Sequence, residues 1–349
     1  MKRAWATVLL VLAALAVAPS GTASADPLSW RLTPTGTDAQ LRGLSVISRH
    51  VAWASGARGT VLRTVNGGKT WRQVGPPDTA TLELRDIEAF DERTAVAMTI
   101  GNGEDSRIYR TTDGGATWTE TFRNTEPAAF YDCIAFFDRR YGLAAGDPVD
   151  GHFRILSTSD GGRSWTRVPD DGIPPALEGE FEFAASGQCV TTTGKRDAWI
   201  ATGGGASARV LHSADRGRTW TVSDTPLLSG PSAGVFAVAF RTPRQGIAIG
   251  GDFANPAGGE HNLALTSDGG RTWREPVNSP AGYRSAVTYH PFLGSVLLAV
   301  GPTGSDVSVD GGRRWHQFDD GTFDTVDCGR DGACWASGAQ GRVGVLQLG

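Results

Sequence analysis

A short motif recurs six times along the chain and restricts the fold more than any other feature of the sequence. Each copy runs Thr/Ser-x-Asp/Asn-x-Gly-x-x-Trp, and the closing tryptophans lie 47, 47, 55, 53 and 42 residues apart. The third residues are Asn66, Asp113, Asp160, Asp215, Asp268 and Asp310, and the tryptophans are Trp71, Trp118, Trp165, Trp220, Trp273 and Trp315. Repeats of this period, with strand-like runs between turns, indicate a propeller or a solenoid.

Each repeat also reads as four short strands separated by turns, as in residues 85–90, 94–98, 107–111 and 117–122. Seven segments align as first strands, and they open at Arg42, Arg85, Asp132, Gln188, Val235, Arg284 and Asp324. The seventh repeat lacks a fourth strand, which residues 29–32 at the other end of the chain can supply. We therefore predict an all-β, seven-bladed propeller of four-stranded blades over residues 26–349. Its ring is closed by the N-terminal strand, which leaves no open edge between the first and last blades.

The first 25 residues have the pattern of a secretory signal peptide. Lys2 and Arg3 precede an apolar run over residues 4–17, and small residues at 23–25 form a cleavage site. The alternative is a membrane anchor, but the run is shorter than the about 20 residues that a spanning helix needs. We predict that residues 1–25 are removed on export. The mature chain is then secreted or extracytoplasmic, in the periplasm or at the cell exterior, with no transmembrane segment.

An oxidising compartment permits disulfides, and the chain has four cysteines. Cys328 and Cys334 flank a predicted hairpin turn, so we expect them to be bridged. Cys133 and Cys189 fall at equivalent positions of neighbouring innermost strands. A bridge between them is sterically allowed, but their Cα atoms could also lie beyond the limit of about 7 Å, so the sequence leaves this pair open.

Neither a metal site nor a cofactor is predicted. The sequence has no CxxC pair, no HxxxH spacing, no calcium-binding loop and no phosphate-binding glycine loop. The chain contains 33 Lys and Arg against 37 Asp and Glu, a net charge of −4. Since a general nucleic-acid binder needs a net basic face, we predict no nucleic-acid partner, and we expect a monomer.

The repeated motif is the Asp box, known from sialidases and many other propellers. Its aspartate accepts hydrogen bonds from the turn's own backbone, its glycine supplies positive φ, and its tryptophan packs between sheets. We therefore interpret all six motif copies as structural, and Asn66, which keeps the turn without the charge, fits that role. These turns join third to fourth strands and so lie on one face of the ring. Loops that enter first strands, or join second to third strands, lie on the opposite face.

We expect the binding surface on that opposite face, around the central channel, where propellers usually bind. Polar residues open six of the seven first strands there, namely Arg42, Arg85, Asp132, Gln188, Arg284 and Asp324. Neighbouring loops add Asp147, Asp150, Asp252 and Glu180, the last of these from the long loop that enters the fourth repeat. A guanidinium can hold a carboxylate or a phosphate through two hydrogen bonds. The competing interpretation is a solvated channel mouth whose charges pair with one another.

One functional class that fits is a secreted glycoside hydrolase of sialidase-like type. Such an enzyme needs an arginine triad, a Tyr–Glu pair and an acidic aspartate. Residues 153–156 (Phe-Arg-Ile-Leu) resemble the sialidase Phe-Arg-Ile-Pro, but they lack the proline and precede the third motif copy instead of the first. Xyloglucanase-type enzymes use two such propellers, and this chain has one.

The other class is a non-catalytic scaffold. The regular unit, such as residues 246–250 followed by 267–273, resembles the photosystem II stability/assembly factor family of seven-bladed propellers, which has exported relatives in bacteria without photosynthesis. The resemblance implies binding of a membrane-protein assembly intermediate through an arginine-rich face, for which Arg42, Arg85 and Arg284 are candidates. We therefore predict an exported binding or assembly scaffold for a protein or glycan ligand, with no catalytic residue. The glycoside hydrolase is the alternative.

Overall fold

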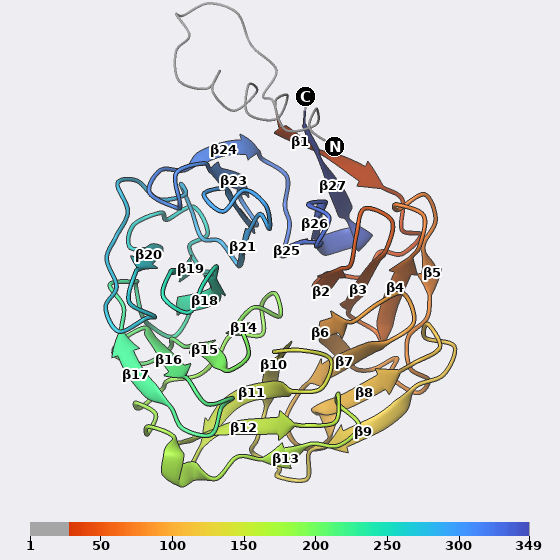
Figure 1. The fold of residues 1–349 in the computed structure, drawn as a ribbon, viewed down its shortest axis with the longest axis horizontal. Coiled ribbons are helices and arrows are strands. Elements are labelled where there is room, and N and C mark those ends of the chain that lie inside the picture. Colours follow the sequence, from red (N-terminus) through yellow and green to blue (C-terminus); the bar gives the residue numbers. More distant parts are fainter. Residues whose placement is uncertain (1–27, 349) are drawn as a thin grey trace, which may run out of the picture.

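The strands form seven antiparallel sheets arranged as the blades of a ring around a central channel, in a computed structural model that describes residues 28–348 (Figure 1). The all-β, seven-bladed propeller is therefore confirmed. The predicted signal peptide, residues 1–25, lies outside the described residues.

Strands run outward in chain order within each of the first six blades. Blades one to three are β2 (Leu41–Val46), β3 (Ala52–Gly56), β4 (Thr60–Thr64) and β5 (Arg72–Gln73); β6 (Glu83–Ala89), β7 (Ala95–Ile100), β8 (Arg107–Thr111) and β9 (Thr119–Arg123); and β10 (Tyr131–Phe136), β11 (Gly142–Val149), β12 (His152–Thr158) and β13 (Thr166–Arg167). Blades four to six are β14 (Val190–Thr193), β15 (Asp197–Ala201), β16 (Arg209–Ser213) and β17 (Thr221–Asp224); β18 (Ala233–Phe240), β19 (Gly246–Asp252) and β20 (Leu263–Thr266); and β21 (Ala286–Tyr289), β22 (Leu297–Gly301), β23 (Gly304–Ser308) and β24 (His316–Asp319). Blade seven is β25 (Thr325–Cys328), β26 (Cys334–Ser337), β27 (Val343–Leu348) and β1 (Leu28–Thr33). Single 3-10 turns occur at η2 (Gly103–Asp105), η3 (Asp170–Gly172) and η4 (Ala339–Gly341).

The two ends of the chain close the ring in blade seven. Strand β1 pairs antiparallel with β27 over six residue pairs, from Leu28 opposite Leu348 to Thr33 opposite Val343. In Figure 1 the two strands lie side by side at the top of the ring. Trp30 is 8% exposed, packs on Phe323 and donates a hydrogen bond from Nε1 to the hydroxyl of Ser305 at 2.9 Å. The predicted closure by the N-terminal strand is confirmed.

Blade five differs at its outer edge. Its fourth position holds only a bridge, in which Leu265 and Arg274 exchange backbone hydrogen bonds of 2.8 and 3.0 Å. Pro276 follows two residues later and has no N–H with which to continue a ladder.

The hydrophobic core lies between neighbouring sheets. Second strands such as β3 and β7 are buried almost throughout and are rich in alanine, because sheets press on both of their faces. The motif tryptophans add edge-on aromatic contacts between blades, for example Trp118 against Trp53 and Trp71 against Trp335. Outer strands such as β5 and β13 are exposed.

The motif turns share one pattern of hydrogen bonds. In the second copy, the carboxylate of Asp113 accepts hydrogen bonds from the backbone N–H and the hydroxyl of Thr117, at 2.9 and 2.6 Å. Gly114 then donates its N–H to the carbonyl of Arg93, in the loop between the first and second strands. Gly67, Gly161, Arg216, Gly269 and Gly311 make the equivalent contact in their own blades. Motif turns and first-to-second loops therefore lie together on one side of the ring, here called the motif face; the other side is called the mouth face.

Over residues 28–348, the structure contains no helix that is long and apolar enough to cross a bilayer.

Candidate functional site

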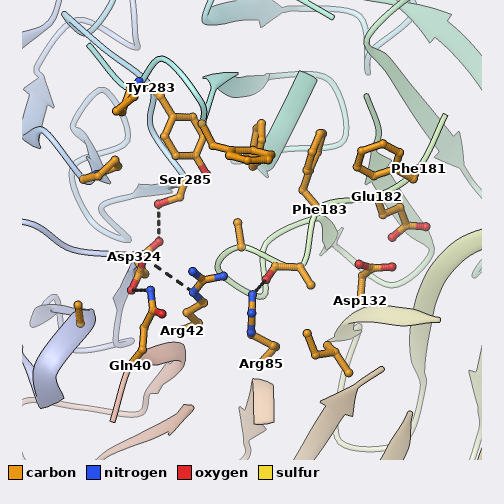
Figure 2. A pocket seen from close by; sticks show the side chains of 18 of the residues that line it. Gln40, Arg42, Arg85, Asp132, Phe181, Glu182, Phe183, Tyr283, Ser285 and Asp324 are labelled. Carbon is orange, nitrogen blue, oxygen red and sulfur yellow. Dashed lines mark hydrogen bonds and ion pairs between the residues drawn. The ribbon is translucent and has the colours of Figure 1, made fainter. Parts of the chain in front are cut away.

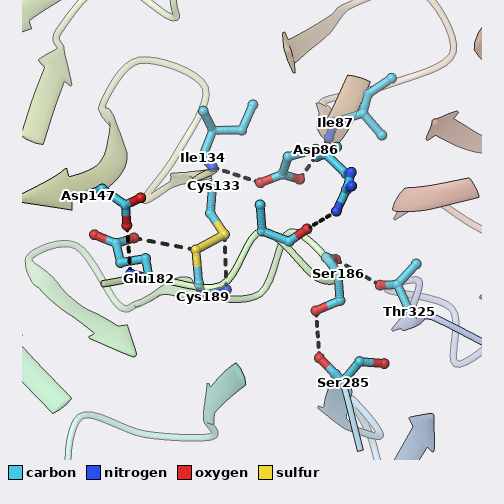
Figure 3. Close-up of a disulfide and its surroundings, with 12 residues drawn as sticks. Asp86, Ile87, Cys133, Ile134, Asp147, Glu182, Ser186, Cys189, Ser285 and Thr325 are labelled. Atoms are coloured by element: carbon cyan, nitrogen blue, oxygen red, sulfur yellow. Dashed lines mark hydrogen bonds between the residues drawn. A yellow bond between two sulfur atoms is a disulfide. The ribbon is translucent and has the colours of Figure 1, made fainter. Parts of the chain in front are cut away.

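A segment of the long loop before β14 crosses the central channel, and Figure 3 shows its end, from Ser186 to Cys189. Residues 181–188, here called the channel segment, contact blades on the far side of the axis. Ser186 donates its hydroxyl to the carbonyl of Ser285 at 2.7 Å, and Gln188 donates from Nε2 to the carbonyl of Val326 at 2.8 Å. Arg85 of blade two donates to the carbonyl of Ala184 at 2.6 Å. The segment thus separates two pockets. Residues 181–185 line a pocket on the mouth face, and residues 186–188 line a second pocket nearer the motif face.

A glycine allows the channel segment to pack closely against the first strand of blade two. Gly187 has a φ of 74°, and a Cβ on it would come within 2.5 Å of the carboxylate of Asp86. That carboxylate already accepts the backbone N–H groups of Ile87 and Ile134, each at 2.7 Å. Burial raises the pKa of Asp86 to about 8. A larger residue at 187 would therefore push against a fixed, buried group.

A disulfide fixes the end of the channel segment. Cys189, the residue after the segment, is bonded to Cys133 of β10, and their Cα atoms are 5.9 Å apart. The pair that the sequence left open is therefore bridged. Cys328 and Cys334 form the second disulfide, as predicted, at the turn between β25 and β26.

The hollow on the mouth face has a volume of about 650 Å³, and we call it the mouth pocket. Figure 2 shows two arginines, Arg42 and Arg85, on one side and the acids Asp132 and Glu182 on another. Across the pocket from the arginines stands a wall of aromatic rings from four segments of the chain. Its members are Phe181, Phe183, Phe236, Phe253 and Tyr283.

The two arginines lie side by side and are held from behind. Arg85 donates from Nε to Glu83 at 2.7 Å, and Arg42 lies 4.0 Å from a carboxylate oxygen of Asp324. Asp324 also accepts a hydrogen bond from Gln40 at 3.0 Å. Burial, and next the charge of Arg42, lower the pKa of Arg85. Among the described residues, the buried Nε of Arg42 has no hydrogen-bond acceptor. An anionic group between these guanidiniums would relieve their repulsion.

The acidic side of the pocket is largely buried. Asp132 and Glu182 are 1% and 2% exposed, and Asp147 accepts the backbone N–H of Glu182 at 2.9 Å. Burial, and next the charge of Asp147, raise the pKa values of Asp132 and Glu182 well above normal. Burial raises the pKa of Asp147 to about 6. One oxygen of Asp132 and one of Glu182 have no partner within residues 28–348. These three acids therefore hold protons at pH values where exposed carboxyl groups have lost theirs.

The aromatic wall offers an apolar surface. Phe183 stacks on Phe236 with ring centroids 3.8 Å apart, and Tyr283 packs edge-on against Phe236 at 4.6 Å. Phe253 stands at the rim and is 52% exposed. Sequence reasoning missed this wall. The alternation of Phe181 and Phe183 with acids in the long loop was the available signal.

The structure brings five of the predicted binding residues into this pocket: Arg42, Arg85, Asp132, Asp147 and Asp324. Gln188, the last residue of the channel segment, instead lines the second pocket, nearer the motif face, where its side chain bonds to the backbone of Val326 and Val287. Asp150 and Asp252 are outside the pocket lining, and Asp252 caps its own loop by accepting the N–H of Ala254.

Two predicted binding residues are instead paired in the interior. Arg284 is 0% exposed and donates to Asp306 at 2.6 Å and to Thr303 at 2.7 Å. Glu180 is 5% exposed, pairs with Arg209 and accepts the hydroxyl of Thr202 at 2.5 Å. Their role as surface ligands is therefore wrong. Each is paired with a residue 22 positions away in the chain.

No protein-family model matches the chain, and no curated protein matches it by sequence. Solved structures do match. YCF48 bound to a D1 peptide has a TM-score of 0.64 and 17% identity, covering 95% of this chain and 99% of that one. YCF48 from Cyanidioschyzon merolae has a TM-score of 0.61 and 15% identity, covering 91% and 98%. The GH74 xyloglucanase from Xanthomonas campestris has a TM-score of 0.61 and 17% identity, covering 90% of this chain but 53% of the enzyme. At such identities the similarity shows the fold alone.

Proposed function

We propose that this chain is an exported, non-catalytic binding protein that holds a segment of a partner protein in the mouth pocket. The observation that carries the proposal is the combination, in one hollow of about 650 Å³, of an arginine pair and an aromatic wall. A protein segment offers both of the groups that such a hollow suits, a carboxylate and an apolar side chain. A further support is that YCF48, whose fold this chain shares, has been solved with a bound peptide.

The two sides of the pocket contribute differently to binding. Hydrogen bonds from Arg42 and Arg85 to a carboxylate are charge-assisted and contribute about 1.5–3 kcal/mol each when water is excluded. The bond from Arg85 to Ala184 and the ion pair of Arg85 with Glu83 already fix its orientation, so little side-chain entropy is lost on binding. The aromatic wall adds about 25 cal/mol for each Å² of apolar ligand surface that it covers.

The test uses peptides selected from a random-sequence phage library on the immobilised mature protein. We expect the selected peptides to carry an acidic group next to an apolar side chain. Binding should weaken by at least about tenfold in Arg42→Ala. Arg31→Ala, which removes an exposed arginine from β1 outside the pocket, is the matched control and should bind as the unaltered protein does. Selected peptides that bind Arg42→Ala, and also Arg42→Ala with Arg85→Ala, at unchanged affinity would refute the proposal.

A secreted glycoside hydrolase is the competing proposal, and the acids of the pocket are the observation in its favour. A catalytic acid needs a raised pKa, which burial gives to Asp132 and Glu182. The shared propeller fold of the xyloglucanase is compatible with this function. A screen of chromogenic glycosides and soluble glycans separates the two classes. Turnover that Asp132→Asn abolishes in a folded protein would replace the binding proposal.

A further inference from the structure

Charge is distributed unevenly between the two faces of the ring. The motif face consists of thirteen short segments: seven loops that join first to second strands, and six motif turns. Together these segments contain 16 Lys or Arg residues and nine Asp or Glu residues. The whole chain has 33 against 37. One face is therefore strongly cationic, although the molecule as a whole is acidic.

Nearly all cations of the motif face are exposed, whereas most of its acids are half-buried. Fifteen of the 16 basic side chains are exposed. Of the nine acidic side chains, only Glu92 and Asp138 are exposed. Five of the other acids are motif aspartates, whose oxygens accept hydrogen bonds from their own turns, as Asp268 does from Arg271 and Thr272 at 3.0 Å. Among the described residues, only three of the fifteen exposed cations have an ion-pair partner, namely Arg49, Arg139 and Arg314. The remaining cations face solvent.

The arrangement of these cations fits a planar partner. Every one of the seven blades contributes at least one exposed cation, so the charges surround the ring instead of following a stripe. The hollow beside Tyr141 on this face has a volume of about 160 Å³, far smaller than the mouth pocket. Apolar side chains also project from this face, including Phe292 at 67%, Val65 at 48% and Val309 at 39% exposure. Because the turns are nearly identical, they cannot recognise a ligand of one particular shape. They are suited to a flat surface that presents many phosphate groups.

We propose that the motif face docks on an anionic phospholipid bilayer. Guanidinium groups hold phosphate oxygens through paired hydrogen bonds, and thirteen of the fifteen exposed cations are arginine. Phe292 and the two valines would enter the headgroup region. The acidic residues elsewhere on the molecule do not prevent docking, because charges more than about one Debye length, roughly 8 Å, from the bilayer are screened at physiological salt. Docking in this orientation leaves the mouth pocket open to a partner on the side away from the bilayer.

The test is sedimentation of the mature protein with vesicles of phosphatidylcholine alone or mixed with phosphatidylglycerol. We expect binding only to the mixed vesicles, and weaker binding as salt rises. The triple variant Arg196→Glu, Arg218→Glu and Arg244→Glu should bind about 100-fold less tightly. None of these three side chains is engaged in an ion pair with a described residue. The matched control is Arg31→Glu, Arg58→Glu and Arg123→Glu, which changes the net charge equally but on strand β1, in the turn between β3 and β4 and at the mouth-face end of β9, all away from the motif turns.

The two triple variants separate docking by a face from an effect of net charge. The control should keep nearly all of its affinity if docking uses the motif face, and melting curves of both variants confirm that they are folded. Equal loss in the two variants would refute the proposal, as would a failure of the unaltered protein to prefer mixed vesicles. A duplex DNA of unrelated sequence is the second probe. Tighter binding to this DNA than to the mixed vesicles at the same salt would point to a nucleic-acid partner and overturn the proposal.

Discussion

Three arginines that align at the start of first strands in the sequence have different surroundings in the structure. Arg42 and Arg85 keep 27% and 18% of their side chains exposed and border the mouth pocket. Arg284 has none exposed, because Asp306 and Thr303 hold its guanidinium in the interior. Removing Arg284 would leave a buried carboxylate unpaired, which typically costs several kcal/mol. The first two residues can therefore be altered to probe binding, whereas altering the third would test stability.

Replacing a motif aspartate should lower stability without affecting the mouth pocket. Asp113→Ala removes an acceptor for the backbone and hydroxyl of Thr117, and its pKa of about 2 reflects those hydrogen bonds. We expect a lower Tm and unchanged peptide binding. Asp113→Asn is the matched control, because Asn66 makes the equivalent bond to the N–H of Thr70 at 3.0 Å. Differential scanning calorimetry measures the effect. A Tm of Asp113→Ala equal to that of the unaltered protein would contradict it.

Asp147→Asn should change how stability depends on pH. Burial raises the pKa of Asp147 from 3.8 to about 6, so between these values the folded protein holds a proton that the unfolded chain releases. The protonated carboxyl group therefore makes its full contribution to the free energy of unfolding below about pH 4, and this contribution is lost as the pH rises through about 6. We expect Asp147→Asn to be more stable than the unaltered protein near pH 8, by about 3 kcal/mol, and nearly equal at about pH 4. Asparagine keeps the oxygen that accepts the N–H of Glu182.

Urea unfolding at a series of pH values measures this difference. The matched control is Asp150→Asn, which alters an exposed acid in the turn that directly follows the same strand, β11. It should leave the pH dependence as it is. A constant difference between Asp147→Asn and the unaltered protein across the series would show that the carboxyl group is not the cause.

The channel segment shows what one element contributes to the site. It supplies Phe181, Glu182 and Phe183 to the mouth pocket, and hydrogen bonds to blades two, six and seven hold it across the axis. The Cys133–Cys189 bridge anchors its end. A loop held at so many points is a rigid element, which favours precise placement of a binding surface.

Strand β1 should be essential to the stability of the last blade. Trp30→Ala removes a side chain that is 8% exposed and packed on Phe318 and Phe323, and such a change typically costs about 3–5 kcal/mol. Leu32→Ala, at 51% exposure in the same strand, is the matched control and should cost little. Thermal melts compare the two. Equal melting temperatures for Trp30→Ala and the unaltered protein would contradict the role of this strand.

The sequence predicted the elements better than the site. Motif spacing and the alignment of first strands were sufficient for seven blades and for the pairing of residues 29–32 with blade seven, because both follow from local pattern. Which side chains meet across the channel depends on contacts between distant segments. The pairing of Arg284 with Asp306, that of Glu180 with Arg209, and the path of the channel segment over the axis leave no local signature.

At the scale of the whole molecule, net charge was a poor guide to electrostatics. A total of 33 basic against 37 acidic residues argued against a net basic face of the kind that a nucleic-acid binder needs, yet the loops on one side of the ring hold 16 basic and nine acidic residues. The alternation of turns along the chain produces this asymmetry, because every second turn returns to the same face. A calculation of charge by turn type, made on the predicted strands, would have found it.

The pairing of β1 with β27 also has a consequence for the order of events during synthesis. Trp30 and Leu346 are opposite each other in the sheet although 315 residues separate them in the chain. Blade seven therefore cannot be completed until residues 343–348 have been made, while earlier blades can pair their own strands as they emerge. Until then, strand β1 has no sheet to join, and blade one lacks a finished neighbour on the side that blade seven will occupy. Chaperones or proteases that act on the nascent chain would find these two places last to become protected.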